Sequence, residues 1–320
     1  YNGTDAAVKS LKSAEVNAAI EGALQAGATE IVVRDGHGAD QNLNPTLLNK
    51  NCIYVNGRKP GCCETMVLGI DESYDALIFI GAHAMAGKEN GVLSHTMSRK
   101  VIDYKLNGIS MGECPYNALY AGLFNVPVAF ISGDDVTAEE TRQFFGNIET
   151  VITKKAIGRV AAANYNPKEV CKRIRDRVNL AIETLREDLI AAEIDGTLED
   201  LKSGKIPYTS AKVLKMDPPY KMEVWMAAEN DSRDVAAYYT ATSESLYEVM
   251  RVLLHLAGAA LARLVQFLLG WCHTIRATVR TAISPPTLFC CAQLPISRCV
   301  RCSSTMVANC GSPIRSRRTG

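Results

Sequence analysis

Histidine is the residue type in this chain that most clearly suggests metal binding or catalysis, and it occurs only five times in 320 residues. Three of the five, His37, His83 and His95, have small residues (Gly, Ala, Ser or Thr) on both sides. Small neighbours let a loop fold tightly and let a metal ion approach the imidazole nitrogen, which is a common zinc ligand. A single loop histidine is more often a hydrogen-bonded structural residue, but the three together favour metal ligation.

A hydrolytic zinc site usually adds a carboxylate to its histidines and keeps an open position for water. Glu113, in the segment Gly112-Glu-Cys-Pro115, is the clearest carboxylate candidate. It lies just before a predicted helix near Asn117, so it could equally be an acid that stabilises the first turn through the helix dipole. The residues alone leave both interpretations open. Asp134 and Asp135 also follow a predicted strand, but capping and loop roles suit them better.

Short apolar runs precede these polar residues and are typical of buried strands. Each run is followed at once by a polar loop: 30–34 by Asp35-Gly-His-Gly38, 76–80 by Gly81-Ala-His83, and 126–131 by Ser132-Gly-Asp-Asp135. Because helical patterns alternate with the strands, we predict an α/β fold with a mostly parallel sheet flanked by helices. Functional groups of such sheets gather beyond the carboxyl ends of the strands. We therefore expect His37 and His83 at one edge of one sheet.

Capping residues set the expected helix boundaries. The predicted caps are Ser13 for a helix that runs to about Ala26 and is stopped by Gly27, Thr137 with Glu140 as a capping box, and Asn166 followed by Pro167 for a long amphipathic helix.

We predict three regions along the chain. Residues 1–190 form the α/β catalytic domain, and residues 191–262 form a smaller C-terminal α+β region with a strand near 220–226. Residues 263–320 lack Lys, Asp and Glu and are rich in Cys, Arg and Ser. They are either a tail that binds metal through Cys299-Val-Arg-Cys302 or a disordered, non-native stretch, and the abrupt change in composition favours the second interpretation.

The charge balance excludes some classes of function. The first 250 residues hold 26 of the 35 basic residues and all 34 acidic residues, a net charge of −8. An acidic body without a basic face excludes nucleic acid as a partner. The apolar stretch 252–271 contains His255 and Arg263, so we interpret it as part of a core helix and expect no membrane association. Irregular cysteine spacing and the lack of a signal peptide predict the cytoplasm.

Several motifs occur in the order and spacing of a known enzyme family. They are Asp35-Gly-His-Gly38, Gly81-Ala-His-Ala84, Gly91-Val-Leu-Ser-His-Thr-Met97, and Asn107-Gly-x-x-x-Gly-Glu113 followed by Asn117-Ala-x-x-Ala-Gly122. On these motifs the chain resembles the zinc D-aminopeptidase family of the dipeptide-transport operon type. The resemblance runs from about residue 8 to about residue 258, and its most specific element is the block at 91–97.

The resemblance implies a dinuclear zinc aminopeptidase that hydrolyses short peptides from a free N-terminus, with D-Ala peptides among the expected substrates. His37, His83 and Glu113 match three of the family's metal-ligand positions. His95 matches a histidine beside the metals that takes part in catalysis. The resemblance also implies a homo-oligomer, with a decamer as the expected form.

One feature of the family has no match in this chain. The resemblance implies an Asp-x-Glu pair of metal ligands on a first strand, and no such strand precedes the helix at Ser13. Because the chain opens at Tyr1 rather than Met, we expect an N-terminal truncation that removes these ligands and leaves an exposed edge or a gap in the sheet. The alternative function is therefore an inactive α/β fragment or binding module with an incomplete metal site. A nucleotide-binding domain is disfavoured because no Gly-rich phosphate loop follows a predicted strand.

Overall fold

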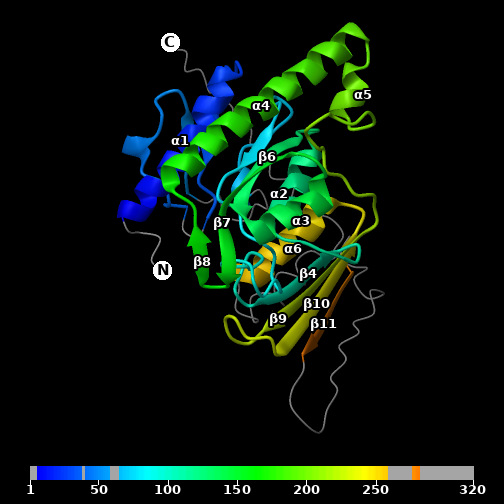
Figure 1. Ribbon diagram of the computed structural model, residues 1–320. Coiled ribbons are helices and arrows are strands. Elements are labelled where there is room, and N and C mark those ends of the chain that lie inside the picture. The colour runs from blue at the N-terminus through cyan, green and yellow to red at the C-terminus, as the bar shows by residue number, and fades with distance from the viewer. Residues whose placement is uncertain (1–5, 38–39, 58–64, 259–275, 282–320) are drawn as a thin grey trace, which may run out of the picture. The chain divides into compact units, whose positions relative to one another are not determined.

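The computed structural model describes residues 6–37, 40–57, 65–258 and 276–281, which all belong to the unit Tyr1–Ile283 (Figure 1). Strands and helices alternate along much of the chain, and the sheets are partly parallel. The predicted α/β fold is thereby confirmed. Apart from 276–281, the predicted tail at 263–320 lies outside the described residues.

The central sheet has the strand order β3-β6-β7-β8. Strands β3 (Leu77–Phe79), β6 (Val128–Asp134) and β7 (Glu149–Gly158) are parallel, whereas the edge strand β8 (Ala161–Asn164) is antiparallel to β7. Every residue of β6 is buried, and the strand contributes side chains to both hydrophobic cores. An uninterrupted apolar run such as the one that begins β6 is expected for a parallel strand with both faces covered.

A separate parallel ladder joins β1 (Val32–Arg34) to β2 (Ile53–Val55). The expectation that β1 and β3 share one sheet is therefore wrong for the residues that the structure describes. Segment 42–49 lies against the first helix through hydrogen bonds, including Asn44 N–H to Ser13 Oγ at 3.0 Å and Asn49 N–H to Asn17 Oδ1 at 2.8 Å. These contacts position β2 and the loop after β1.

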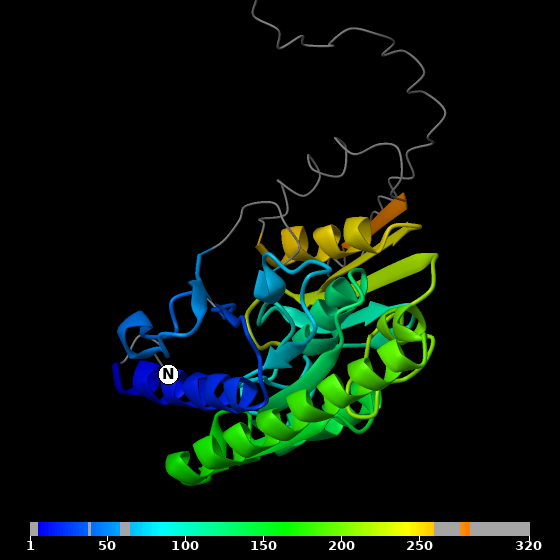
Figure 2. The same ribbon diagram turned by 90° about the horizontal axis from the view of Figure 1, so that it is seen from above.

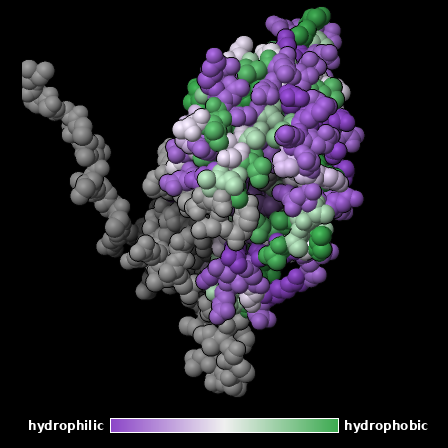
Figure 3. All heavy atoms as spheres, turned by 60° about the vertical axis from the view of Figure 1, so that its left-hand side comes forward, coloured by the Kyte–Doolittle hydropathy of each residue, from purple (hydrophilic) through white to green (hydrophobic). Residues whose placement is uncertain are grey.

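Two long helices, α1 (Ala6–Gln25) and α4 (Pro167–Ile194), lie side by side over one face of the central sheet (Figure 2). They approach closely at Gly22, where an added Cβ would lie 2.3 Å from the carbonyl oxygen of Arg175. Small residues at such a crossing let two helix backbones come together. The face of the molecule in Figure 3 is mainly hydrophilic, with apolar residues in scattered groups.

The predicted caps had mixed outcomes. Asn166 accepts from Lys168 N–H at the start of α4, so this cap is confirmed. Ser13 lies inside α1, because the helix begins earlier and the Ser13 hydroxyl serves the 42–49 segment instead. The capping box of Thr137 and Glu140 is also wrong. The N-cap of helix α3 (Asp135–Phe145) is Asp134, whose carboxylate accepts from Thr137 N–H.

A second sheet of five antiparallel strands has the order β11-β10-β9-β4-β5. Its strands are β4 (Val101–Leu106), β5 (Ile109–Ser110), β9 (Tyr220–Ala227), β10 (Val235–Ser243) and β11 (Arg276–Thr281). Helix α6 (Leu246–Gly258) packs against β9 and β10. Helix α2 (Glu113–Gly122) is wholly buried, and its Tyr116 hydroxyl donates to Met250 O on α6.

The remaining elements are short: η1 (Pro45–Leu47), η2 (Thr65–Val67) and α5 (Leu198–Lys202). The predicted strand near 220–226 is confirmed as β9, but β9 pairs with β4, which lies within the first predicted region. The region boundaries near residues 190 and 262 stay a prediction. Among the described residues, every helix is too short or too polar to cross a membrane.

Candidate metal centre

Four elements deliver the predicted site residues to one place. His37 lies in the loop after β1, His83 follows β3, His95 lies in the loop before β4, and Glu113 begins α2. The His83 and His95 rings stack with centroids 4.0 Å apart, and the His37 ring lies 6.5 Å and 6.3 Å from them. The structure therefore brings together all four residues that the sequence singled out.

Backbone carbonyls orient two of the imidazole rings. His83 Nδ1 lies 3.1 Å from Ala84 O, and His95 Nδ1 lies 2.6 Å from Leu93 O. A carbonyl oxygen only accepts, so each Nδ1 is the protonated nitrogen of the neutral ring and Nε2 keeps its lone pair. Both Nε2 atoms face the Glu113 carboxylate, at 3.6 Å for His83 and 3.4 Å for His95.

These separations suit a zinc ion. Two ligands at about 2.0–2.1 Å from a tetrahedral zinc lie roughly 3.3 Å apart, close to the two distances between imidazole nitrogen and carboxylate oxygen. Ligand atoms of His83, His95 and Glu113 all lie within 4.8 Å of one another. Two neutral imidazoles and one carboxylate also form a typical zinc donor set. His37 lies beside this group and is placed to extend it.

Burial and charge set opposite pKa shifts within the cluster. Burial alone raises the pKa of Glu113, but the charge and hydrogen bond of His83, the His95 charge and Met97 N–H outweigh it and lower the pKa to about 2. Burial lowers the pKa of His83, yet the Glu113 carboxylate reverses the shift and raises it above the ordinary value. For His37 and His95, burial and then the nearby His83 charge lower the pKa. Both rings are therefore neutral at pH 7 and able to bind metal.

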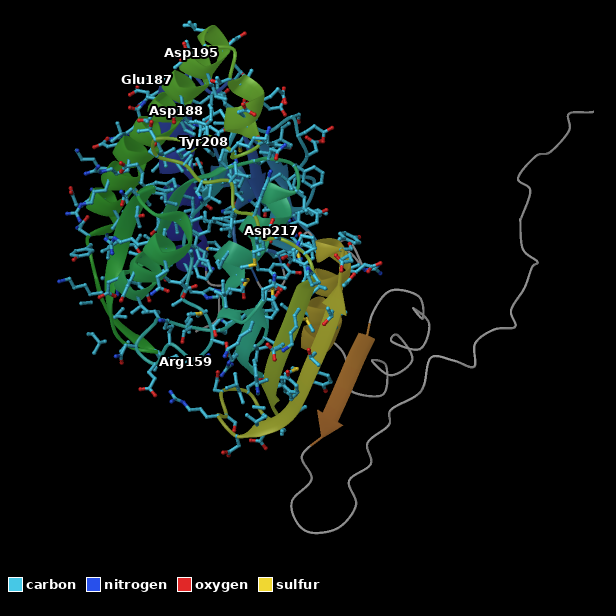
Figure 4. The ribbon with its side chains drawn as sticks, turned by 90° about the vertical axis from the view of Figure 1, so that its right-hand side faces the viewer. Arg159, Glu187, Asp188, Asp195, Tyr208 and Asp217 are labelled. Carbon is cyan, nitrogen blue, oxygen red and sulfur yellow. The ribbon has the colours of Figure 1, made fainter. Side chains whose placement is uncertain are left out.

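The His95 loop is held by the hairpin between β7 and β8, a contact that sequence reasoning missed. Leu93 N–H donates to Arg159 O at 2.8 Å, and Arg159 Nε donates to Ser94 O at 3.3 Å. The Arg159 guanidinium also pairs with Asp231 at 2.6 Å, and Asp231 pairs with Arg99. Figure 4 shows Arg159 near the turn between β9 and β10, which contains Asp231. We call this arrangement of Arg159, Asp231 and Arg99 the clamp.

Asp35 orders the loop that contains His37. Its carboxylate accepts from Asn42 N–H, Leu43 N–H, the Asn42 amide and the Tyr54 hydroxyl, at 2.6 to 3.0 Å. Although burial raises the pKa of Asp35, these hydrogen bonds outweigh it and lower the pKa below the ordinary value. The Asp in the Asp-Gly-His-Gly motif is therefore a loop-ordering residue.

Two further polar residues support the site from behind. Glu140 accepts from Met85 N–H at 2.9 Å and borders a cavity of about 10 Å³ that is also lined by His83. Asn117 donates to Glu113 O at 2.8 Å and accepts from Met66 N–H at 3.2 Å. Asn117 follows Glu113 by four residues, and this spacing is a sequence signal that both lie on one face of the helix. The sequence suggested only a capping role for Glu140, and its contact with Met85 had no sequence signal because the two residues lie 55 positions apart.

Comparisons with known proteins show what the chain is similar to. A family model described as D-aminopeptidase (Peptidase M55) matches residues 3–252. The D-aminopeptidase of Bacillus subtilis (strain 168) is 32% identical over 170 residues, which are 53% of this chain and 61% of the relative. The chain thus spans less than two thirds of that relative's length. A solved structure of the Zn-dependent D-aminopeptidase DppA from Bacillus subtilis, described as a self-compartmentalizing protease, has a similar fold. Its TM-score is 0.61 at 23% identity, with coverage of 77% of this chain and 86% of that one.

Proposed function

We propose that this chain, which belongs to the D-aminopeptidase family, is a zinc-dependent aminopeptidase that hydrolyses short peptides from a free N-terminus. The observation that supports the proposal most directly is the group of His83, His95 and Glu113, whose ligand atoms lie within 4.8 Å. The curated relative named D-aminopeptidase and the solved structure described as Zn-dependent support the same chemistry.

His37, His83 and Glu113 are the proposed zinc ligands. When bound, zinc supplies a Lewis acid and lowers the pKa of a water molecule toward neutrality. Glu113 offsets the charge of the ion, and Met97 N–H holds the carboxylate in place at 2.8 Å. Ala84 O fixes the ring of His83 through Nδ1, which directs Nε2 to the centre of the cluster.

His95 is the proposed catalytic residue. Its lowered pKa leaves Nε2 unprotonated at pH 7, so this atom can take up a proton from the attacking water and then donate it to the leaving amine. The hydrogen bond from Nδ1 to Leu93 O keeps Nε2 facing Glu113 during both steps. The same geometry also allows His95 to act as a zinc ligand. The two roles differ in a His95→Ala variant: a proton-transfer residue leaves zinc content unchanged and abolishes turnover, whereas a ligand loses zinc as well.

The test of the function uses the purified chain, with zinc content measured by atomic spectrometry and hydrolysis of D-Ala and L-Ala dipeptides measured by amine release. We expect zinc to bind and D-Ala dipeptides to be hydrolysed. Glu113→Gln should lower both zinc content and hydrolysis, whereas Glu187→Gln, a matched change on the exposed side of α4, should change neither. A chain that binds no zinc would refute the proposal and favour the inactive binding module.

We also propose a cytoplasmic homo-oligomer, with a decamer as its form. The solved relative is described as self-compartmentalizing, and the described cysteines Cys52, Cys114 and Cys171 are free thiols, as expected in a reducing compartment. Light scattering coupled to gel filtration tests the assembly. Ten copies of the 34.7 kDa chain would give about 350 kDa, and a monomer near 35 kDa would refute the assembly.

A further inference from the structure

A cavity of about 200 Å³ opens at the end of the central sheet opposite the metal centre. It lies where β3 and β6 begin, whereas His83 follows the carboxyl end of β3. Its lining residues come from the segments before β3 and β6, from α4 and α5, and from the segment after α5: Glu72, Tyr74, Asp75, Phe124, Asn125, Pro127, Leu189, Glu199, Lys202 and Tyr208. Figure 4 shows Tyr208 near Asp188, at the other end of the molecule from Arg159.

The walls of the cavity are held in place by specific contacts. Thr209 donates twice to the Asp188 carboxylate, at 2.7 Å from N–H and 2.6 Å from the hydroxyl, and so fixes the neighbouring Tyr208 against α4. Lys215 Nζ donates to Asn125 Oδ1 and to Ser203 O, both at 2.7 Å. These bonds tie the segment before β6 to the segment after α5. Because these walls are already ordered, ligand binding costs little conformational entropy of the lining residues.

The cavity is lined by aromatic and aliphatic side chains together with an excess of carboxylates. Tyr74, Phe124, Leu189 and Tyr208 provide the apolar surface. Of the charged lining residues, three are carboxylates and one is an ammonium group, which leaves a net charge of −2. Lys202 Nζ lies 4.0 Å from Asp75, and within the described residues Glu72 and Glu199 form no ion pair. Two carboxylates therefore remain available to a cation.

Tyr208 is the buried polar group that faces this space. The residue is only 8% exposed, and its hydroxyl has no hydrogen-bond partner among the described residues. Burial, together with the charges of Asp75 and Asp188, raises the pKa of Tyr208 to about 12. The phenol is therefore neutral at physiological pH, and its oxygen can accept a hydrogen bond from an ammonium group. Although the residue is largely buried, its hydroxyl oxygen is not one of the fully buried atoms without a partner, so a ligand that enters the cavity can reach it.

We propose that this cavity binds a small aliphatic diamine, with one ammonium group at the carboxylates of the lining, the other at the Tyr208 hydroxyl, and the alkyl chain against the aromatic rings. A cation is attracted both by the net negative charge and by the faces of aromatic rings, whereas an anion is repelled. The volume is below the roughly 300–1,000 Å³ of pockets for drug-sized ligands, and a cavity of about 150 Å³ is known to hold benzene. The occupant is therefore a small molecule, close in size to benzene.

Isothermal titration calorimetry with 1,4-diaminobutane tests the proposal, with 1,4-butanediol as the neutral control of equal length. We expect saturable binding of the diamine and none of the diol. Tyr208→Phe keeps the aromatic ring and removes only the hydroxyl, so it should weaken binding about tenfold. Glu199→Gln, an exposed change on α5, should weaken binding about threefold. Glu187→Gln, an exposed change outside the cavity lining, should leave the affinity unchanged.

Several results would overturn the proposal. They are a lack of saturable diamine binding, equal binding of the diol, and an affinity that neither Tyr208→Phe nor Glu199→Gln changes. Thermal unfolding of each variant shows whether it is folded, and Glu199→Gln keeps the test valid if Tyr208→Phe is unstable. Because the cavity shares no lining residue with the metal cluster, the result is independent of the proposed peptidase activity.

Discussion

At the scale of single residues, the contact between His83 and Glu113 determines how the metal-free protein responds to pH. The pKa of Glu113 is lowered from 4.5 to about 2, so its contribution to stability is complete above pH 4.5 and is lost as the pH falls toward 2. The pKa of His83 is raised above 6.5, so its contribution is complete below pH 6.5 and is lost as the pH rises through the raised value. The pair stabilises the fold most between these limits.

Glu113→Gln tests this pH window. In metal-free protein, we expect the variant to unfold with a free energy lower by about 3 kcal/mol at pH 5–6, because His83 loses its buried partner. The difference from wild type should shrink on both sides of the window. Chemical denaturation at pH 3, 5.5 and 8.5 measures it, and Glu187→Gln serves as the matched control. A difference that is independent of pH would contradict the assigned ion pair.

Zinc affinity should also depend on pH through His83. Zinc and a proton compete for Nε2 of His83, and the raised pKa of this ring strengthens the proton as a competitor. His37 and His95 have lowered pKa values and are already neutral at pH 7. We therefore expect the zinc dissociation constant, measured with a chromophoric chelator, to rise about tenfold for each pH unit below the pKa of His83. A constant affinity from pH 8 to pH 5 would remove His83 from the ligand set.

Much of the candidate site could be predicted at this scale. The sequence showed loop histidines with small neighbours after apolar runs. It also showed Glu113, for which metal ligation was one of two equal interpretations. The support of the site was not visible. Glu140 and Asp231 contact loops that are distant in sequence, and no local pattern indicates which distant backbone N–H or guanidinium a carboxylate will bind.

At the scale of elements, the β7–β8 hairpin holds the His95 loop through the clamp. Arg159→Ala removes the bond to Ser94 O and the ion pair with Asp231. Because a shift of about 1 Å in a catalytic group can cost on the order of a hundredfold in rate, we expect kcat to fall about tenfold or more with zinc content unchanged. Arg159→Lys should recover part of the loss through the Asp231 pair.

The control for the clamp is Arg233→Ala. Arg233 lies in the same β9–β10 turn as Asp231, and the change breaks its exposed ion pair with Glu89. Peptide hydrolysis and zinc content are measured for the three variants, and the histidine ring signals are followed by NMR. The NMR signal of His95 should shift in Arg159→Ala even if the chain hydrolyses no peptide. Equal effects of Arg159→Ala and Arg233→Ala would show that the clamp has no special role.

The crossing of α1 and α4 leads to a prediction about stability. A Cβ on Gly22 would lie 2.3 Å from Arg175 O, a backbone atom that cannot move without shifting a whole helix. We expect Gly22→Ala to destabilise the protein by about 1–3 kcal/mol in chemical denaturation, although alanine has the higher helix propensity. Gly158→Ala is the matched control, since nothing lies within 4 Å of its added Cβ. A stabilised Gly22→Ala variant would contradict the close packing.

Local sequence signals located most elements but not their partners. Asn166 with Pro167 and Gly27 marked helix ends correctly, because caps depend on neighbouring residues only. Ser13 misled, since its hydroxyl has a tertiary use that competes with capping. The pairing of β4 with β9 joins segments that lie far apart in the chain. The sequence patterns of the two strands contain nothing that selects this pairing over others.

At the scale of the whole molecule, the metal centre lies where separate substructures meet. His37 follows the β1–β2 pair, His83 follows a strand of the central sheet, and Glu113 begins the helix that packs beneath the antiparallel sheet. Within the described residues no backbone ladder joins the β1–β2 pair to the central sheet. A bound zinc would therefore connect the β1–β2 pair to the central sheet, which no strand-to-strand hydrogen bonds join in the described residues.

This arrangement predicts a local effect of zinc on hydrogen exchange. Strands β1 and β2 have three residues each, and short ladders with partly exposed residues open readily. Since zinc binds only the closed form, it should slow exchange by up to the factor 1 + [Zn]/Kd, about a hundredfold at 100 Kd. We expect mass spectrometry to show the largest slowing in residues 31–37 and 53–55, and little in the buried strand β6 outside global unfolding. In His37→Ala, zinc should still protect the loop with His95 and lose its effect on β1 and β2. Slowing that is uniform over the protein, or unchanged in His37→Ala, would show that His37 does not join the β1–β2 pair to the metal.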